Sequence, residues 1–397
     1  MYVSKEASDY PKIKTTKPND QNLLINNIEI SVSESEKRNN GTLNLREYYT
    51  VYLIETKLIN QTFEGKLSKH STLWRRYTEF EQLQSYLELT FPYLVLPPLP
   101  EKRVIRAGLE NFLLRIASHP VLCWDQHFLQ FLQDEEGWRD SFKANGYLYL
   151  VENKLRSLSV SIRLKKSHPR FESVKDYSSE LQLVLGNLLK ARSRVAEKSF
   201  TVHKLHSNYG RVFSEWSASE IEMGDALQKS GHYLDSLSAC IDSALEDEEL
   251  LADQLKEYLF FAQSLQGVCK NWEILQLKLE DSEDSVANKN IERTKIMQGK
   301  SSIMSRLFGA VDTDEVRELK INELDQQIQE GVVAVDECKG NLQDFTAKAL
   351  TDIERFQNER IVDLRDTLTN YSFLQLKTAK KGLQTWMQIR DCLQNVP

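Results

Sequence analysis

Arg75, Arg76 and Tyr77 are consecutive, and they form the group in this sequence best suited to binding chemistry. A guanidinium group offers a planar fork of donors that matches a phosphate, and an aromatic ring can stack on a sugar or inositol face. Lys102 follows beyond a proline-rich stretch and supplies a further cation. We therefore predict a site for a phosphorylated head group. On spacing alone, a surface arginine pair beside a core tyrosine is the more common arrangement.

Elsewhere the sequence contains no pattern typical of catalysis or metal binding. It has no nucleophile paired with a base, no glycine-rich phosphate loop and no cluster with metal-ligand spacing. His203 and His206 have no cysteine near them, so we interpret them as ordinary helix-face residues. The five cysteines are widely spaced, which is typical of a reduced, cytosolic chain: Cys123, Cys240, Cys269, Cys338 and Cys392. We predict no enzyme, no metal and no cofactor.

A small α+β domain over residues 21–136 is expected to position the arginine group. Residues 1–20 are polar and predict a disordered lead without a signal peptide or transmembrane helix. Runs of β-branched and aromatic residues predict three strands, with a polar loop at Glu34–Asn44: Leu23–Val32, Tyr48–Leu58 and Thr72–Tyr77. Thr78 and Glu81 have capping-box spacing, so a helix should begin there. Apolar periodicity predicts two further helices, Leu109–Ser118 and Gln126–Gln133.

The stretch Leu96–Pro100 is too rich in proline for a helix or a central strand. We expect an extended polyproline-type loop there, and this loop would hold Lys102 beyond it. The spacing of Pro97, Pro100 and Lys102 also resembles a ligand of SH3 domains.

Residues 137–171 are predicted to form a basic linker or amphipathic helix. Eight basic residues in 137–170 face only Asp140 and Glu152, which gives a local charge of +6. The apolar residues from Leu148 to Ile162 fit one helical face, whereas Leu158–Leu164 alternate as in a strand. We favour the helix, because a basic amphipathic helix can lie on a membrane surface. The basic residues assigned to that surface are Lys154, Arg156, Arg163, Lys165 and Lys166.

Residues 172–397 are predicted to be almost entirely helical. The 227 residues between Pro169 and Pro397 contain no proline, where average usage would give about eleven. Apolar residues advance by threes and fours from Leu251 to Leu279 and again from Leu324 to Phe356, as on a buried helix face. A helix of about 70 residues is roughly 100 Å long. We therefore predict an elongated bundle, a form that commonly dimerises, with the apolar stripes as its core.

Two junctions are expected to divide this helical region. The acidic run Glu246–Glu249 is predicted to mark the first junction, and the segment Gly299–Gly309 the second. Asp312 and Glu315 then offer a capping box for the last helix. Three glycines are candidates for kinks: Gly210, Gly224 and Gly231.

Several long motifs resemble those of a known family. Trp74–Phe80, Leu96–Lys102 and Gly108–Phe112 are similar to the signatures of a PX (phox homology) domain. Asn208–Trp216 and Asp253–Leu259 are similar to the BAR domain of a sorting nexin. The resemblance to the PX-BAR sorting nexin family covers nearly everything after residue 20.

This resemblance implies a fold and a function. The fold is an α+β PX domain, a small antiparallel sheet plus helices, followed by an all-α BAR domain of long antiparallel helices that dimerises into a curved arch. The function is recognition of phosphatidylinositol 3-phosphate on early endosomes, with curvature sensing and cargo sorting into recycling tubules, and with autophagy as a second setting. In the family, the residue matching Arg76 holds the 3-phosphate, that matching Tyr77 stacks on the inositol, and that matching Lys102 meets the 1-phosphate.

The chain departs from this family at one point. In the family, the fourth ligand of the lipid is an arginine that reads a ring hydroxyl, three residues before the glycine that matches Gly108. This chain has Ile105 there, so the candidate for the fourth phosphoinositide-binding residue is Arg106, which is offset by one position. Relatives also place a longer segment after Lys102, with a membrane-inserting loop, where this chain has only residues 103–107. A splice form, a gene-model omission or a truly shortened domain would each produce this gap. We expect weaker lipid binding in every case.

Two functions follow as hypotheses. The first is a peripheral membrane protein that binds membranes containing phosphatidylinositol 3-phosphate and pairs with itself or with another PX-BAR sorting nexin. The second is a soluble helical scaffold whose PX module binds no lipid. The net charge of −7 argues against nucleic acid as a partner. The residues first considered for a basic concave face are Lys190, Arg192, Arg194, Lys198 and Lys204.

Overall fold

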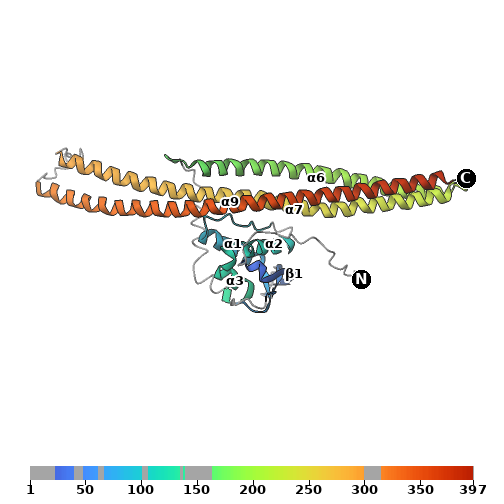
Figure 1. The fold of residues 1–397 in the computed structure, drawn as a ribbon, viewed down its shortest axis with the longest axis horizontal. Helices are drawn as coiled ribbons and strands as arrows, with labels where there is room; N and C mark the ends of the chain where they lie inside the picture. The colour runs from blue at the N-terminus through green and yellow to red at the C-terminus, as the bar shows by residue number, and fades with distance from the viewer. Residues whose placement is uncertain are drawn as a thin grey trace. The chain divides into compact units, whose positions relative to one another are not determined.

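The computed structural model describes residues 23–39, 48–60, 67–100, 106–134, 137–138, 163–298 and 314–396 (Figure 1). The chain separates into two compact units. The first contains Met1–Gln84 and Leu99–Tyr147, and the second contains Ser85–Pro98 and Leu148–Pro397. The predicted lead over residues 1–20 lies outside the described residues, and the domain limits given above stay a prediction.

A three-stranded antiparallel sheet forms the first unit, in the order β1-β2-β3. Its strands are β1 (Ile28–Asn39), β2 (Tyr48–Leu58) and β3 (His70–Arg76), and a short 3-10 helix, η1 (Leu24–Asn26), precedes them. The predicted small antiparallel sheet is therefore confirmed. β-branched and aromatic residues of β1 and β2 face the core, where Ile28, Val51 and Ile54 are buried.

The polar loop predicted at Glu34–Asn44 is wrong over its first half. The register of β1 on β2 shifts between Val32 and Glu34, and β1 then continues as a strand to Asn39, opposite Tyr48. A bulge of this kind inserts one residue and lets pairing resume beyond it. Most side chains of this extension are exposed, so polar residues are compatible with a strand there. A prediction based on alternating apolar residues therefore misses this part of β1.

Helices cover the sheet of the first unit. These are α1 (Tyr77–Thr90), α2 (Arg106–Ala117), the 3-10 helix η2 (Leu122–Trp124) and α3 (Gln126–Gln133). The helix predicted at Gln126–Gln133 is confirmed, and Asp125 caps it by accepting a hydrogen bond from the N–H of Phe128 at 2.9 Å. Phe80 and Phe131 meet edge to face in the core, with ring centroids 5.0 Å apart.

The capping box predicted for α1 at Thr78 and Glu81 is wrong. The carboxylate of Glu79 accepts a hydrogen bond from the backbone N–H of Arg76 at 2.7 Å, and α1 begins at Tyr77. Thr78 therefore lies inside the first turn. The strand β3 sets this boundary, because Arg76 still pairs with Val51 of β2.

Among the described residues of the second unit, three long helices predominate: α6 (Pro169–Ser217), α7 (Gly224–Met297) and α9 (Asp314–Gln394). They run antiparallel in chain order, and α7 contacts both α6 and α9 (Figure 1). The predicted region of long antiparallel helices is confirmed. No helix among the described residues is long and apolar enough to cross a bilayer.

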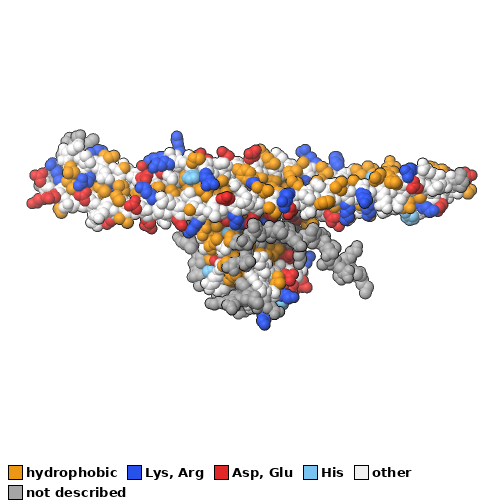
Figure 2. Space-filling view, in the orientation of Figure 1, with side chains coloured by type: hydrophobic (Ala, Val, Ile, Leu, Met, Phe, Trp, Pro, Cys, Tyr) orange, Lys and Arg blue, Asp and Glu red, His pale blue; other side chains and the backbone are white. Residues whose placement is uncertain are grey.

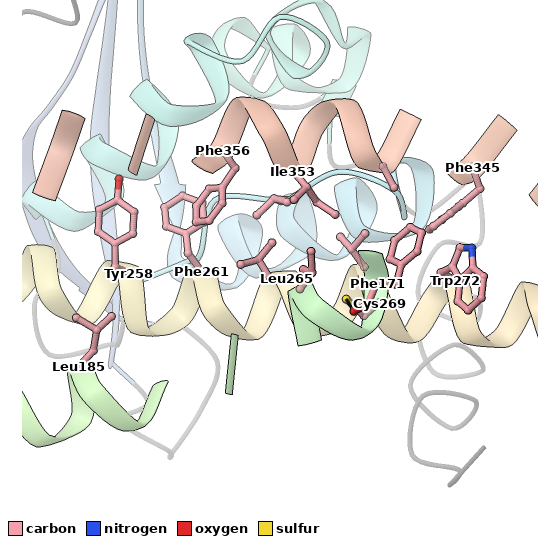
Figure 3. Close-up of a cluster of buried hydrophobic side chains, with 14 of the residues drawn as sticks. Phe171, Leu185, Tyr258, Phe261, Leu265, Cys269, Trp272, Phe345, Ile353 and Phe356 are labelled. Carbon is pink, nitrogen blue, oxygen red and sulfur yellow. Dashed lines mark hydrogen bonds between the residues drawn. The ribbon is translucent and has the colours of Figure 1, made fainter. Parts of the chain in front are cut away.

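An apolar cluster joins the three helices (Figure 3). Phe171 of α6 stacks on Trp272 of α7 at 5.0 Å, and Phe261 of α7 meets Phe356 of α9 at 5.1 Å. Cys269 lies in the same cluster, and its burial raises the pKa of its thiol to about 12. The prediction that aromatic and cysteine residues on the stripes form a core is confirmed for these side chains.

The first predicted junction is wrong. The acidic run Glu246–Glu249 lies inside α7, and the chain turns between α6 and α7 at residues 218–223. Glutamate is a good helix former, so an acidic run can continue a helix. Repulsion within the run is reduced by a neighbouring helix, because Glu249 pairs with Arg192 of α6 at 2.8 Å. The second junction, Gly299–Gly309, lies outside the described residues, as does Asp312.

Two of the three glycines expected to kink helices instead allow a close helix approach. Gly210 and Gly231 lie inside continuous helices, α6 and α7. A Cβ on Gly210 would lie 2.9 Å from the carbonyl oxygen of Gly231, and a Cβ on Gly231 would lie 2.8 Å from that of Gly210. Gly224 is the first residue of α7.

Candidate functional site

Arg76, at the end of β3, is half-buried, and its guanidinium carbon lies 3.6 Å from the ring centroid of Tyr49. Its backbone is fixed by pairing with Val51 and by the bond to Glu79. Within the described part of the chain, no carboxylate forms an ion pair with the Arg76 side chain, and no acceptor takes a hydrogen bond from it. The charge and the N–H donors of Arg76 therefore have no partner among the described side chains, and its assignment to a phosphate site stays a prediction.

Tyr77 follows at the first position of α1, and its hydroxyl donates to the carbonyl oxygen of Pro100 at 2.6 Å. Pro100 in turn packs against α2, where a Cβ on Gly108 would lie only 2.7 Å from the Cβ of Pro100. The structure thus brings Tyr77, Pro100 and Gly108 together, three positions from the three family motifs. Lys102 lies outside the described residues.

Arg106, the first residue of α2, is exposed and donates through Nη1 to the carbonyl oxygen of Ser33 at 2.6 Å. Glu110, one turn later, accepts a hydrogen bond from the N–H of Val32 at 2.9 Å. Both contacts hold the bulge of β1. The guanidinium of Arg106 thus donates to a backbone carbonyl of the protein, whereas that of Arg76 donates to none among the described residues.

Arg75 is a structural residue, which corrects its assignment to the phosphate site and to a surface pair. Its side chain is fully buried, and its guanidinium carbon lies 4.7 Å from the ring centroid of Phe131 and 5.3 Å from that of Trp138. Its Nη2 donates to the carbonyl oxygens of Phe131 at 2.8 Å and Asp134 at 2.6 Å, and its Nη1 pairs with Glu79 at 3.2 Å. Arg75 therefore ties β3 to the end of α3.

The strand alternation contains the signal that separates the two arginines. Leu73 is buried, and Arg75, two residues later, must face the same side of β3. Arg76 faces the other side. Glu79 serves both, since one carboxylate oxygen pairs with the Arg75 side chain and the other accepts from the Arg76 backbone.

Residues 64–135 match the PX domain family, a range that contains Arg76, Tyr77, Pro100 and Gly108. The chain is also 42% identical to human sorting nexin-4 over 397 residues, which covers 94% of this chain and 88% of that protein. The chain belongs to the sorting nexin family.

More distant sorting nexins also match. Sorting nexin-30 of Xenopus tropicalis is 26% identical over 367 residues, covering 88% of this chain and 73% of that protein. Among solved structures, the Imp2 F-BAR domain is 13% identical, with a TM-score of 0.35 over 57% of this chain and 79% of that one. A score this low carries no conclusion about this sorting nexin.

The basic segment of this sorting nexin is described only from Arg163 onward. Residues 139–162, with Lys154, Arg156 and the predicted apolar helix face, lie outside the described residues. Residues 163–168 are not helical, so the predicted helix does not extend over them, and α6 begins at Pro169. A residue before proline disfavours helical conformation, which gives a physical reason for this boundary.

Lys165 and Lys166 are exposed, but both are held by α7. The side chain of Lys165 pairs with Asp284, and that of Lys166 pairs with Glu283 at 3.4 Å. The backbone N–H groups of both lysines donate to the carboxylate of Glu280, at 2.8 and 2.9 Å.

Glu280 is the buried anchor of this segment, with 4% of its surface exposed. Burial alone would raise the pKa of its carboxyl, but the N–H groups of Lys165 and Lys166 and the amide of Gln276 stabilise the charged form, so the pKa lies below its ordinary value.

Helix α6 exposes apolar side chains at intervals of seven residues, which is the spacing of a helix-pairing stripe. Figure 2 shows hydrophobic side chains along the surface of the helical unit. The members of this stripe are between 41% and 57% exposed: Leu188, Val195, Val202, Tyr209 and Trp216.

The residues first considered for a basic face lie on the same helix. Lys190, Arg194, Lys198 and Lys204 are exposed. The Arg192 side chain is only 13% exposed and pairs with Glu249, so we correct its assignment to that face.

The histidines and cysteines form no second site among the residues that the structure describes. His203 bonds to Ser238 at 2.9 Å, and His206 contacts the carbonyl oxygen of Val202 on its own helix. All five cysteines are free thiols. Within the described ranges, no group of three or more ligand-type side chains could hold a metal ion.

Proposed function

We propose that this sorting nexin is a peripheral membrane protein that binds phosphatidylinositol 3-phosphate through Arg76. The supporting observation is the half-exposed Arg76 guanidinium, which lies on an aromatic ring and has no anionic partner among the described residues. A guanidinium fork matches a phosphate in geometry, and charge-assisted hydrogen bonds of this kind are about twice as strong as neutral ones.

The neighbouring residues supply the rest of the proposed pocket. Tyr77 stacks on the inositol ring, and Lys102 meets the 1-phosphate. Arg106 contacts a ring hydroxyl only by giving up the carbonyl oxygen of Ser33. The proposed PX domain spans residues 21–136, so all four residues belong to it.

The helical region contributes a dimer in this proposal. The stripe on α6 leaves large apolar side chains in water, and covering them with a second helical region removes that cost. The proposed BAR domain, residues 172–397, pairs with a second copy or with another PX-BAR sorting nexin, forms a curved arch and senses or imposes membrane curvature. The setting we propose is the early endosome, where such a dimer sorts cargo into recycling tubules, and also autophagy.

The basic linker, residues 137–171, adds non-specific attraction to an anionic leaflet. Arg163 is exposed and can contribute directly. Lys165 and Lys166 contribute only where lipid replaces Asp284 and Glu283 as their counter-charge. Lys154 and Arg156 are part of the same proposal. We propose no catalytic activity, no cofactor and no nucleic-acid partner.

The alternative function is a helical dimeric scaffold whose PX module binds no lipid. Two observations favour it: Arg106 is bonded to Ser33, and only residues 103–107 separate Lys102 from Gly108. A pocket without its fourth ligand would bind a head group more weakly.

Sedimentation with liposomes tests the choice between these functions. We expect the wild-type chain to bind vesicles containing phosphatidylinositol 3-phosphate more tightly than vesicles of equal charge without it. Arg76→Ala should abolish that difference. Lys57→Ala is the matched control, because Lys57 is an exposed cation of the same sheet and lies at the other end of β2 from Tyr49 and Val51. A wild-type chain indifferent to the 3-phosphate would support the scaffold.

A further inference from the structure

The ring of Tyr49 lies directly beneath the guanidinium of Arg76, although the two residues are 27 positions apart. The sheet register explains this contact. Val51 of β2 is opposite Arg76 of β3, and Tyr49 lies two residues from Val51 on the same face of the sheet. We propose that Tyr49 is a positioning residue for lipid binding, which holds Arg76 ready for the phosphate. This inference deepens the function proposed above and rests on it.

Stacking suits this role better than an ion pair would. A carboxylate would occupy the N–H groups at the edge of the guanidinium and neutralise its charge. An aromatic ring contacts the flat face instead, so the N–H groups at the edge remain available to phosphate oxygens. Tyr49 therefore orients the side chain and leaves its binding capacity intact.

Preorganisation gives the physical reason for an effect on affinity. A free arginine side chain loses rotamer freedom when it binds, and that loss weakens binding. The backbone of Arg76 is already fixed by strand pairing and by Glu79. The ring of Tyr49 restricts the remaining torsions, so less freedom is lost when the phosphate arrives.

Two substitutions at Tyr49 separate the ring from the hydroxyl. Tyr49→Leu removes the aromatic face, and Tyr49→Phe keeps it. The control is Tyr48→Leu, because Tyr48 is adjacent, 62% exposed and on the opposite face of β2. Each full-length variant is titrated with soluble inositol 1,3-bisphosphate by calorimetry, and its melting temperature is measured alongside.

We expect Tyr49→Leu to weaken head-group binding by about three- to tenfold, the range of a partly desolvated cation–π contact. Tyr49→Phe and Tyr48→Leu should bind within about twofold of wild type, since both retain the Tyr49 ring position. If Tyr49→Leu lowers the melting temperature, Tyr49→Thr, which has high β propensity, repeats the comparison.

A double-mutant cycle with Arg76→Lys distinguishes positioning from a general structural role. Lysine keeps the charge but lacks the planar face, so Tyr49→Leu should cause little further loss in that background. An equal loss in both backgrounds would overturn the inference, and so would unchanged binding by Tyr49→Leu. Failure of the wild-type chain to bind would instead overturn the proposed function, and this inference with it.

Discussion

Two regions of this sorting nexin carry positive charge assigned to a membrane, and they differ in what neutralises that charge. Arg76 lies on the ring of Tyr49 and has no anionic partner in the described part of the chain. Lys165 and Lys166 lie against Asp284 and Glu283. The residue types are alike, so the neighbours decide which charge is available. In the proposed function, Arg76 binds a phosphate without losing an ion pair, whereas Lys165 and Lys166 must first exchange their carboxylate partners.

The role proposed for Arg76 can be tested by mutation only if the domain stays folded without its side chain. Arg75 should behave in the opposite way, because its buried side chain stabilises the fold. Arg75→Ala removes a buried cation together with the hydrogen bonds that it donates to Glu79 and to two carbonyl groups. We expect it to lower the free energy of unfolding by about 3–5 kcal/mol. Arg76→Ala loses only the contact with the Tyr49 ring, so we expect a smaller loss of about 1 kcal/mol. Urea denaturation of both variants measures the difference, and equal destabilisation would break the comparison.

Removing the carboxylates that pair with Lys165 and Lys166 should leave these lysines without an anionic partner, as Arg76 is. Replacing both counter-charges, with Glu283→Gln and Asp284→Asn together, is expected to raise affinity severalfold for anionic vesicles that lack the 3-phosphate. The gain should shrink at high salt, because exposed charges are screened. Co-sedimentation at two salt concentrations measures it.

The matched control for this double variant is Asp225→Asn together with Asp344→Asn, which also removes two negative charges. Asp225 and Asp344 likewise pair with exposed lysines, Lys229 and Lys348, away from the basic segment. An equal gain from the control would show that net charge alone acts, and no gain from the double variant would remove Lys165 and Lys166 from membrane binding.

Low pH should break the hydrogen bonds from the backbone N–H groups of Lys165 and Lys166 to Glu280, an effect smaller than the two above. The pKa of Glu280 is lowered in the folded protein, so its contribution to stability is present above the ordinary carboxyl pKa of 4.5. That contribution is lost as the pH falls through the folded pKa. We expect the Lys165 and Lys166 amides to lose protection below pH 4.5 and to stay protected at neutral pH.

Hydrogen exchange followed by NMR measures this release, after correction for the intrinsic exchange rate at each pH. Glu280→Gln keeps one acceptor oxygen and cannot ionise, so its amides should be partly protected at every pH tested. Protection in the wild-type chain that does not change down to the lowest pH would contradict the role of Glu280.

The sequence predicted the fold best where a physical requirement repeats along the chain. The absence of proline and the spacing of apolar residues from Leu251 to Leu279 and from Leu324 to Phe356 correctly predicted the long helices and their core. Boundaries were harder. The acidic run Glu246–Glu249 looked like a junction because its partners Arg192 and Gln375 lie on other helices.

The candidate site shows the same limit. Arg76 and Tyr77 were proposed from their residue types, and β-strand alternation from Leu73 would have placed Arg75 inside the core. Tyr49 could not be found from the sequence. Its position beneath Arg76 depends on the register between β2 and β3, which only the folded sheet reveals.

One measurement tests most directly whether Arg76, rather than the basic segment, gives this sorting nexin its lipid specificity. Vesicles with and without phosphatidylinositol 3-phosphate, matched in charge, are sedimented with wild type, with Arg76→Ala and with the double variant Lys165→Ala/Lys166→Ala. The account predicts that the increment due to the 3-phosphate disappears in Arg76→Ala and survives in the lysine variant. An increment that survives Arg76→Ala would contradict it.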